Sequence, residues 1–517
     1  MAVNWRDAGA QTAGRGRSEL RRRANFLLGV ALVVILVGLA AECHCLAADR
    51  PNVLFIISDD LNTSLGCYGH AEVETPNLDQ LAERGVRFAH AYCQYPLCGP
   101  SRNSMLTGLY PASTGILQNS QIFRQTIPRH HSLPQAFRLS GYFVGRIGKL
   151  YHYNVPNSIG TDGHDDPASW ELELNPIGYD RTVDPDEIFS LRPGKFGATL
   201  SWYASPRSDE HLTDGMIADQ ADWVFERCAQ RPERPFFLAV GFFRPHTPYI
   251  SPQSYFDQYP LSSVELRQDP NEDESDIPPI ALQCRHKEEL AMSDDLKREA
   301  TRAYYASVSF MDAQVGHVLD SLDRHGLTEN TIVVFTSDHG YHLGEHRLWQ
   351  KRSLFEESAG VPLIISAPGI AKAGSVANTP VGLIDLYPTL AQLCGVSTPD
   401  NLQGQDLAPI LGDPNAEGRG WALTCVNRPN GSKTRFGYSL RTQRWRYTEW
   451  IDGNEGRELY DHQQDPREQN NLASDPEYSD TVAQLSGTLH QAIKTTFPPS
   501  GKTPEVRPGN WAPSLIP

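Results

Sequence analysis

The stretch Asn52-Val-Leu-Phe-Ile-Ile-Ser58 is almost entirely apolar, and two acidic residues, Asp59 and Asp60, follow it directly. An apolar run without polar alternation is typical of a strand that is buried on both faces, as in a parallel sheet. Four further segments have the same character, at 142–147, 236–242, 331–337 and 362–366. We therefore predict a central sheet that contains residues 52–58 as a buried strand.

Helical patterns alternate with these strands. Residues 74–85 combine Thr75 as a candidate N-cap, Pro76 in the first turn and Gly85 at the end. Residues 297–325 place apolar side chains on one helical face, and Gly326 follows them. The alternation predicts an α/β fold with a large, mostly parallel central sheet flanked by helices.

The domain organisation follows from length and from a change of pattern near residue 415. The chain has 517 residues, 39% of them hydrophobic, which fits one large domain and a smaller one. We expect a catalytic α/β domain over 49–414 and a smaller C-terminal α+β subdomain over 415–517, with a hairpin at 438–450 and a final helix at 479–496. Residues 267–290 are acidic and broken by proline, which is typical of a surface loop.

Residues 1–48 have the pattern of a secretory signal peptide. Arginines come first, an apolar run follows at 26–41, and small residues precede Asp49. The apolar run is short for a helix that spans a bilayer. We therefore expect cleavage, no stable membrane insertion afterwards, and export to a periplasm, to the outside or to a lysosome-like compartment. An uncleaved membrane anchor is the alternative.

Charge and cysteine content exclude some classes of protein. The formal net charge is −16, from 46 Lys+Arg and 62 Asp+Glu. Residues 1–48 hold six arginines and three acidic residues, a net of +3, so the mature chain is near −19. Nucleic-acid binding usually needs a basic excess or stripe, and the sequence has neither. The seven remaining cysteines are widely spaced and odd in number, so one of them is expected to have a role other than a disulfide.

Charged and imidazole side chains follow four of the predicted strands. They are Asp59 and Asp60 after 52–58, Lys149 and His152 after 142–147, His246 after 236–242, and Asp338 and His339 after 331–337. Ligands of open α/β sheets bind beyond the carboxyl ends of the strands. Each motif alone is weak, because adjacent aspartates more often cap a helix. Together, three carboxylates and an imidazole suit a hard cation, and the basic residues, with Lys351, suit an anion.

A candidate nucleophile lies in the segment Cys98-Gly-Pro-Ser-Arg102, which continues to Leu106-Thr-Gly108. Pro100 is expected to begin a helix, which places Cys98 at its N-terminus, where backbone N–H groups favour negative charge. Arg102, one turn into the helix, can reach back toward the cysteine. The alternative for an isolated cysteine is a small buried apolar side chain.

This segment resembles the signature of the type I sulfatases, and the resemblance extends from Asn52 to about Asp465. It implies an alkaline-phosphatase-like fold. It also implies that a maturation enzyme oxidises Cys98 to formylglycine, whose hydrated aldehyde is the nucleophile. One Ca²⁺ per chain is implied as well, with five ligands: Asp59, Asp60, Cys98, Asp338 and His339.

Many sulfatases have asparagine where this chain has His339. The residues around the expected site are most similar to the iduronate 2-sulfatase subgroup, in Gly148-Lys-Leu-Tyr-His152, Arg244-Pro-His246 and Leu343-Gly-Glu-His-Arg-Leu-Trp-Gln-Lys351. The similarity is looser at 153–215 and 262–295, which are expected to shape the substrate pocket. It implies hydrolysis of a sulfate ester on a sulfated sugar of the iduronate-2-sulfate type.

The resemblance also suggests roles for the basic residues. Arg102 would hold the nucleophile by charge-assisted hydrogen bonds. Lys149, His246 and Lys351 would contact the sulfate. One of these three or His152 would protonate the leaving alkoxide; the sequence leaves the choice between His246 and Lys351 open, and we favour His246.

Two other functions are compatible with parts of the pattern. A phosphomonoesterase or phosphodiesterase of the same architecture would commonly use Thr or Ser with two zinc ions, and the residues for a second metal are not evident. A secreted carbohydrate-binding protein with an inactive site would keep Cys98 unmodified and bind no metal.

Overall fold

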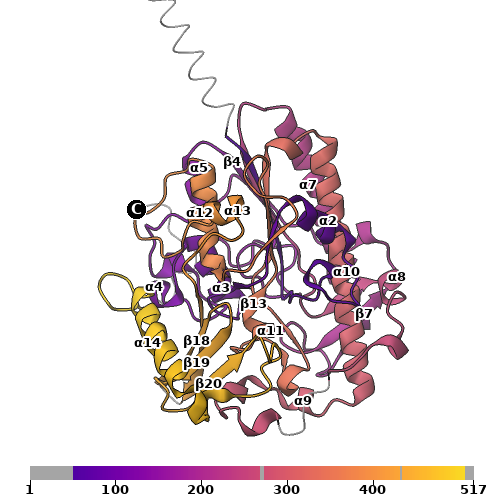
Figure 1. Ribbon diagram of the computed structural model, residues 1–517. Helices are drawn as coiled ribbons and strands as arrows, with labels where there is room; N and C mark the ends of the chain where they lie inside the picture. The colour runs from indigo at the N-terminus through magenta and orange to yellow at the C-terminus, as the bar shows by residue number, and fades with distance from the viewer. Residues whose placement is uncertain (1–49, 268–272, 431–432, 507–517) are drawn as a thin grey trace, which may run out of the picture. The chain divides into compact units, whose positions relative to one another are not determined.

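A computed structural model describes residues 50–267, 273–430 and 433–506, so the expected signal peptide lies outside the described residues. An eight-stranded sheet forms its centre (Figure 1). Its order is β15 (Ser375–Ala377), β2 (Val86–Phe88), β14 (Leu363–Ser366), β10 (Thr331–Ser337), β1 (Asn52–Ser58), β8 (Phe236–Gly241), β4 (Phe143–Gly148) and β5 (Leu172–Leu174).

The sheet is mostly parallel, as predicted. Strands β10, β1, β8, β4 and β5 run parallel to one another, with Val53 paired to Ile332 on one side and to Phe237 on the other. Strand β14 is antiparallel to both β10 and β2, while β15 is parallel to β2. The four strands that precede the predicted site residues are consecutive, and their carboxyl ends therefore meet at one edge.

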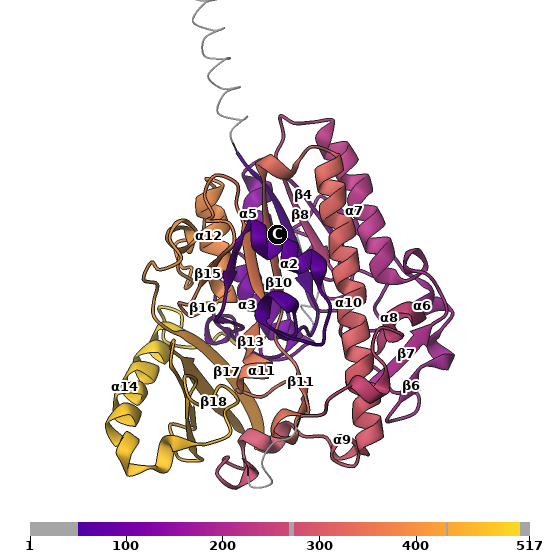
Figure 2. The same cartoon turned by 45° about the vertical axis from the view of Figure 1, so that its right-hand side comes forward.

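Helices cover both faces of this sheet, because alternate side chains of β1 point in opposite directions. Leu54 and Ile56 pack in one core cluster with α2 (Pro76–Arg84), α7 (Thr213–Ala229) and α10 (Asp294–Arg324). Phe55 packs in a second cluster with α3 (Cys98–Thr107), α5 (Leu133–Leu139) and α12 (Leu386–Leu393). Helices α7 and α10 lie side by side along one face (Figure 2).

The helices predicted at 74–85 and 297–325 are both present, but the first residue of each differs from the prediction. Helix α10 begins at Asp294 rather than 297, because the Ser293 side chain caps it through the N–H of Leu296. The expected capping by the Thr75 side chain is wrong. The carboxylate of Asp312, on α10, instead accepts the N–H groups of Asn77 and Leu78 at 3.1 and 2.8 Å, so a neighbouring helix caps α2.

The smaller C-terminal subdomain contains more strands than the predicted hairpin. Strands β17 (Ala422–Asn430), β18 (Lys433–Arg441), β19 (Trp445–Trp450) and β20 (Arg457–Asp461) form an antiparallel sheet, and α14 (Ser479–Thr495) packs against it (Figure 1). The prediction of a surface loop at 267–290 is wrong for its second half. Ile277 and Ile280 are buried against Trp450 and Tyr460, since this segment carries its own apolar residues.

Short elements complete the described chain. Small sheets combine β13 (Gly360–Val361), β3 (Ala91–Tyr92) and β16 (Val381–Gly382); β6 (Phe189–Ser190), β7 (Ser201–Ser205) and β9 (Tyr249–Pro252); and β11 (His342–Leu343) with β12 (Trp349–Gln350). Short helices are α4 (Pro111–Thr114), α6 (Tyr179–Thr182), α8 (Gln253–Phe256), α9 (Lys287–Leu290), α11 (Glu356–Ala359) and α13 (Ala408–Gly412). Among the described helices, none combines the length and apolar character needed to cross a bilayer.

Candidate active site

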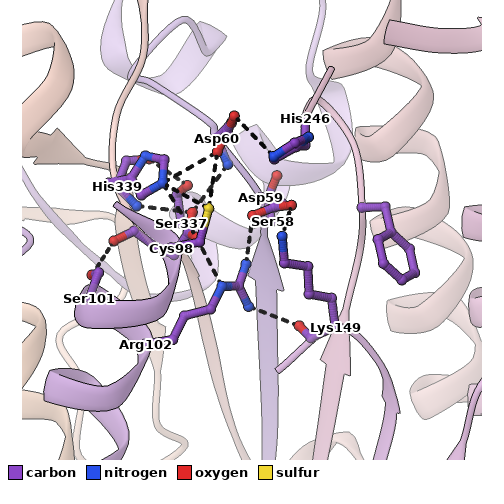
Figure 3. A network of polar contacts seen from close by, with 12 residues as sticks. Ser58, Asp59, Asp60, Cys98, Ser101, Arg102, Lys149, His246, Ser337 and His339 are labelled. Atoms are coloured by element: carbon purple, nitrogen blue, oxygen red, sulfur yellow. Dashed lines mark hydrogen bonds and ion pairs between the residues drawn. The ribbon is translucent and has the colours of Figure 1, made fainter. Parts of the chain in front are cut away.

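Cys98 is the first residue of α3, at the carboxyl edge of the central sheet (Figure 3). All ten residues of α3 are buried, although five of its side chains are polar or charged in addition to the cysteine. The backbone of Gly99 lies so close to the loop at Asn119 that a Cβ atom would be 2.8 Å from its Cα. The helix start is therefore fixed tightly, which holds the thiol in one position.

Arg102 joins three of the strand ends. Its Nε donates to Asp338 Oδ2 at 2.9 Å and its Nη2 to Asp59 Oδ1 at 3.0 Å, with all three side chains fully buried. Its Nη1 donates to the carbonyl oxygen of Lys149 at 2.9 Å. Burial would raise the pKa of Asp338, but the charges of Arg102 and His339 outweigh it and lower that pKa to about 2. Arg102 thus keeps Asp338 in its ionised form, whereas burial raises the pKa of Asp59 to about 6.

Three buried side chains converge beside Cys98, and Figure 3 shows two of them, Asp60 and His339. His339 Nε2 lies 3.3 Å from Cys98 Sγ, 3.3 Å from Asp60 Oδ1 and 3.6 Å from Asp338 Oδ2. Asp60 has a left-handed backbone with φ of 65°, which costs about 1–2 kcal/mol for a residue with a side chain. The N–H of Asp60 donates to Asp338 Oδ1 at 3.1 Å, which helps to offset that cost.

These residues fit a divalent cation. The ligand atoms of Asp60, Cys98, Asp338 and His339 lie within 4.8 Å of one another, and Asp59, Asp60 and His246 form an overlapping group. Asp60 Oδ2 is buried and has no hydrogen-bond partner in the described part of the chain. A buried carboxylate oxygen without a donor is costly unless a cation satisfies it. Three carboxylates are suited to a hard cation, while the imidazole also suits transition metals.

Two lysines bring positive charge to the nucleophile position. Lys351 Nζ lies 2.6 Å from Asp60 Oδ1 and 3.2 Å from Cys98 Sγ. Lys149 Nζ is paired with Asp59 Oδ2 and is fully buried. Burial would raise the pKa of the Cys98 thiol, but the charges of Lys351, Lys149 and His339 outweigh it and hold that pKa well below its usual range. The site thus stabilises negative charge at position 98.

A cavity of about 600 Å³ opens beside this group and is lined by His152, His246 and Lys351. His246 Nδ1 lies 2.6 Å from the carbonyl oxygen of Thr247, and its Nε2 lies 3.7 Å from Asp60 Oδ2. A backbone acceptor at Nδ1 fixes that nitrogen as the donor and leaves Nε2 facing the site. Burial lowers the pKa of His152 to about 4, so this imidazole is neutral near pH 7.

All ten residues expected at the site lie at the carboxyl edge of the central sheet, but not all of them face the cavity. His152, His246 and Lys351 face the cavity, whereas Lys149 is turned inward onto Asp59. Arg244, which follows β8, pairs with Asp180 at 2.6 Å and does not join them. No disulfide joins two of the seven cysteines of the described residues.

Sequence reasoning missed several residues of the cavity wall. They are Asn119, Asn154, Phe196, His286, Arg352 and Asn427. They come from loops distant in the sequence, and a lone residue in a loop carries no local pattern. The expectation that 153–215 and 262–295 shape the pocket agrees with Phe196 and His286. His286 and Arg352 also give the wall further basic side chains, and no acidic side chain lines this cavity among the described residues.

Comparison with known proteins agrees with this geometry. The sulfatase family pattern matches residues 51–396, and the C-terminal pattern of N-sulphoglucosamine sulphohydrolase matches residues 344–495. A sulfatase of Formosa agariphila is 34% identical over 461 residues, covering 86% of this chain and 88% of the relative. Iduronate 2-sulfatase of Mus musculus is 31% identical over 555 residues, covering 91% and 98%.

Solved structures give the same fold. A 2-O GAG sulfatase has a TM-score of 0.69 at 26% identity, covering 86% of this chain and 92% of its own. A phosphonate monoester hydrolase of Agrobacterium radiobacter has a TM-score of 0.71 at 23% identity, covering 87% and 96%. The fold is therefore shared with enzymes that cleave other esters. The match over two thirds of the sequence, together with Cys98-Gly-Pro-Ser-Arg102 at the strand ends, places this chain in the type I sulfatase family.

Proposed function

We propose that this sulfatase removes sulfate from a sulfated sugar of the iduronate-2-sulfate type, with residue 98 converted to formylglycine and one Ca²⁺ held beside it. The observation that supports this best is the position of Cys98. Its Sγ lies 3.2 Å from Lys351 Nζ and 3.3 Å from His339 Nε2, at the start of a fully buried helix. A nucleophile that must carry negative charge is suited to such surroundings.

A modified residue 98 and a bound cation would supply part of the chemistry. The hydrated aldehyde of formylglycine would supply an oxygen nucleophile, and a second hydroxyl through which sulfate can leave without attack of water on sulfur. A cation bound by Asp59, Asp60, Asp338, His339 and residue 98 would reduce the repulsion between an anionic nucleophile and an anionic ester.

The side chains of the site then have distinct roles. Arg102 fixes Asp59 and Asp338, so the carboxylates keep their positions while charge moves in the site. Lys351 and His246 line the cavity and would contact the sulfate oxygens, where charge-assisted hydrogen bonds stabilise the transition state. Lys149, paired with Asp59, would act on the sulfate side once the substrate competes for its ammonium group.

His246 is our candidate for the general acid. It is 4% exposed and lines the substrate cavity. The Thr247 carbonyl orients its ring, so Nε2 would be the nitrogen that delivers a proton to the leaving alkoxide. Lys351 is the alternative, although Asp60 holds its ammonium group at 2.6 Å; burial would lower the pKa of Lys351, but the charge of Asp60 outweighs it and raises that pKa above the usual range.

Charge suggests the size of the substrate. A mature chain with a formal net charge near −19 repels a long polyanion. The cavity wall, in contrast, has basic side chains and no acidic one among the described residues. We infer that a chain end or a small sulfated fragment enters the cavity. The N-terminal pattern supports export and prior contact with a maturation enzyme, both as part of this proposal.

The decisive experiment is mass spectrometry of the peptide that contains residue 98, combined with turnover of defined substrates. Conversion of the thiol to an aldehyde lowers the peptide mass by about 18 units, since one H₂S is lost and one O is gained. We expect this shift, and Ca²⁺-dependent release of sulfate from a 2-O-sulfated uronate disaccharide. A free thiol in material that cleaves sulfate esters at full rate would refute the proposed nucleophile. Faster cleavage within intact polymer would refute the fragment substrate.

A further inference from the structure

The hydroxyl of Tyr304 contacts the strained backbone at Asp60. Tyr304 lies within α10, and its side chain is fully buried. Its Oη donates to the carbonyl oxygen of Asp60 at 2.9 Å and accepts the N–H of Asn62 at 3.0 Å. A single hydroxyl therefore bridges two backbone groups on either side of Leu61. The proposed reaction gives Tyr304 no role.

The segment 60–62 depends on side chains for its backbone hydrogen bonds. It follows β1 directly, it belongs to no helix or strand, and all three residues are buried, so its N–H and C=O groups need partners from other elements. The N–H of Asp60 donates to Asp338 Oδ1 at 3.1 Å, and the N–H of Leu61 donates to Ser337 Oγ at 2.9 Å. These two partners come from the end of β10, whereas Tyr304 comes from a helix on one face of the sheet. The segment is thus held from two directions.

Aromatic neighbours fix the ring of Tyr304. It stacks on Tyr341, with ring centroids 5.4 Å apart and an angle of 16°, and it meets Tyr249 edge to face at 5.6 Å. All three side chains are fully buried. Tyr249 Oη donates to Tyr341 Oη at 2.7 Å, and it makes no hydrogen bond to residues 60–62 among the described residues. Packing therefore sets the position of the Tyr304 hydroxyl before any ligand binds.

The backbone of Asp60 decides where both of its carboxylate oxygens lie. Its Oδ1 is 2.6 Å from Lys351 Nζ and 3.3 Å from His339 Nε2. Its Oδ2 is buried without a hydrogen-bond partner in the described chain and lies 3.7 Å from His246 Nε2 (Figure 3). The residue has φ of 65°, a conformation that persists only where surrounding contacts maintain it. A change in that conformation would move both oxygens together.

We propose that Tyr304 is a positioning residue, whose hydroxyl holds Asp60 in the left-handed conformation from which its carboxylate binds the active-site cation. The inference rests on the proposed function, which gives Asp60 a cation to bind. Without the hydroxyl, the carbonyl of Asp60 and the N–H of Asn62 each lose a partner in a buried place, which is unfavourable. The segment would then relax toward an ordinary backbone conformation, and the carboxylate would leave the position that suits the ion.

The test compares Tyr304→Phe with Tyr249→Phe in the purified full chain. Each variant loses one buried hydroxyl and keeps its ring, so Tyr249→Phe is the matched control. All proteins carry the same chemical state at residue 98 and are stripped with a chelator, and Ca²⁺ is then titrated by calorimetry. Partners that orient a metal ligand typically contribute about 10–100-fold to affinity. We therefore expect the dissociation constant of Ca²⁺ to rise about tenfold or more in Tyr304→Phe and to stay within about twofold in Tyr249→Phe.

The outcomes separate positioning from general stability. A purely structural hydroxyl would lower the unfolding temperature of the metal-free variant and leave its affinity for Ca²⁺ unchanged. Equal affinity in Tyr304→Phe and the unmodified chain would overturn the inference and leave the proposed function standing. An equal loss in both variants would also overturn it, because the ring cluster and not the bridging hydroxyl would then be responsible. If the unmodified chain bound no Ca²⁺, the proposed cation itself would be refuted, and this inference with it.

Hydrogen–deuterium exchange of the unmodified chain decides the question even where Tyr304→Phe fails to fold. The coupling between two sites is reciprocal, so bound Ca²⁺ should strengthen the hydroxyl bridge just as the bridge strengthens binding. We expect saturating Ca²⁺ to slow exchange of the Asn62 backbone amide, which donates to Tyr304 Oη. The same exchange rate with and without Ca²⁺ would contradict the inference.

Discussion

At the scale of single residues, the site depends on how the backbone presents Lys351. The residues on either side, Gln350 and Arg352, have φ of 67° and 77°, a conformation that costs about 1–2 kcal/mol per residue with a side chain. Arg428 donates to the carbonyl oxygen of Arg352 at 2.7 Å, which helps to maintain it. Strain that other contacts maintain is typical of functional positions, and here it places an ammonium group 3.2 Å from residue 98.

Replacement of Lys351 by glutamine should lower kcat for sulfate-ester hydrolysis by about 10²–10³, because one charge-assisted contact to the transition state is lost. Steady-state kinetics with 4-nitrophenyl sulfate measures this. Lys372→Gln is the control, since Lys372 is exposed, and its kinetics should be unchanged. A kcat within a few-fold of the unmodified enzyme would exclude a role for Lys351 in the reaction.

The His246→Gln variant tests whether His246 donates a proton to the leaving group or only contacts the sulfate. An alkyl leaving group needs a proton in the transition state, whereas 4-nitrophenolate does not. We expect a loss of about 10²–10⁴ in kcat on a sulfated sugar and a much smaller loss on 4-nitrophenyl sulfate. Lys351→Gln, measured in parallel, should affect both substrates alike. The reverse pattern would make Lys351 the proton donor.

At the scale of elements, the close pairing of β4 and β8 positions Lys149. A Cβ atom on Gly241, the last residue of β8, would lie 1.9 Å from the carbonyl oxygen of Lys149. The same carbonyl accepts from Arg102 at 2.9 Å. Only glycine allows the two strand ends to approach so closely. The position of the Lys149 carbonyl, and with it the hydrogen bond from Arg102, therefore depends on Gly241.

Gly241→Ala should therefore lower the free energy of unfolding by about 1–3 kcal/mol, as overpacking does, and should reduce activity by shifting Lys149. Gly487→Ala is the matched control, because Gly487 lies within α14 with open space around it. That change should stabilise the chain by up to about 1 kcal/mol, since alanine favours a helix. Chemical denaturation measures both, and equal stability of the two variants would contradict the role of Gly241.

At the scale of the whole molecule, buried ion pairs join the C-terminal subdomain to the catalytic part. Arg446, in β19, is 1% exposed. It pairs with Glu356 of α11 and with Glu468, and its Nη1 donates to the carbonyl oxygen of Leu354 at 3.0 Å. Residues 354 and 356 follow the segment that carries Lys351. The subdomain thus supports the active-site loop from behind.

Arg446→Met should lower the free energy of unfolding by about 3–5 kcal/mol, because it removes a buried cation from Glu468 and Glu356 and leaves them only His462 and Arg441 as partners. It should also lower activity, since the loop bearing Lys351 loses its support. Arg227→Met is the control: Arg227 pairs with Glu226, and both side chains are about half exposed, so its loss should barely change the midpoint of urea unfolding. A small effect of Arg446→Met on both stability and activity would mean that the subdomain does not support the site.

The central elements and the main site residues could be predicted from the amino-acid sequence alone. Buried strands such as Asn52–Ser58 can be recognised by their uninterrupted apolar residues. The nucleophile segment can be recognised because its residues are consecutive in the sequence. Parallel strands must end at a common edge, so Asp59, Lys149, His246 and Asp338 could be assigned to one site without coordinates.

Contacts between residues far apart in the chain could not be predicted and are seen only in the folded structure. Asp312 caps α2 from another helix, Lys149 turns onto Asp59, and Ile277 is buried under the C-terminal sheet. The cavity wall at His286 and Arg352 likewise comes from separate loops and turns. Such contacts depend on side-chain packing across elements, which leaves no periodic pattern in the sequence because each partner is a single residue.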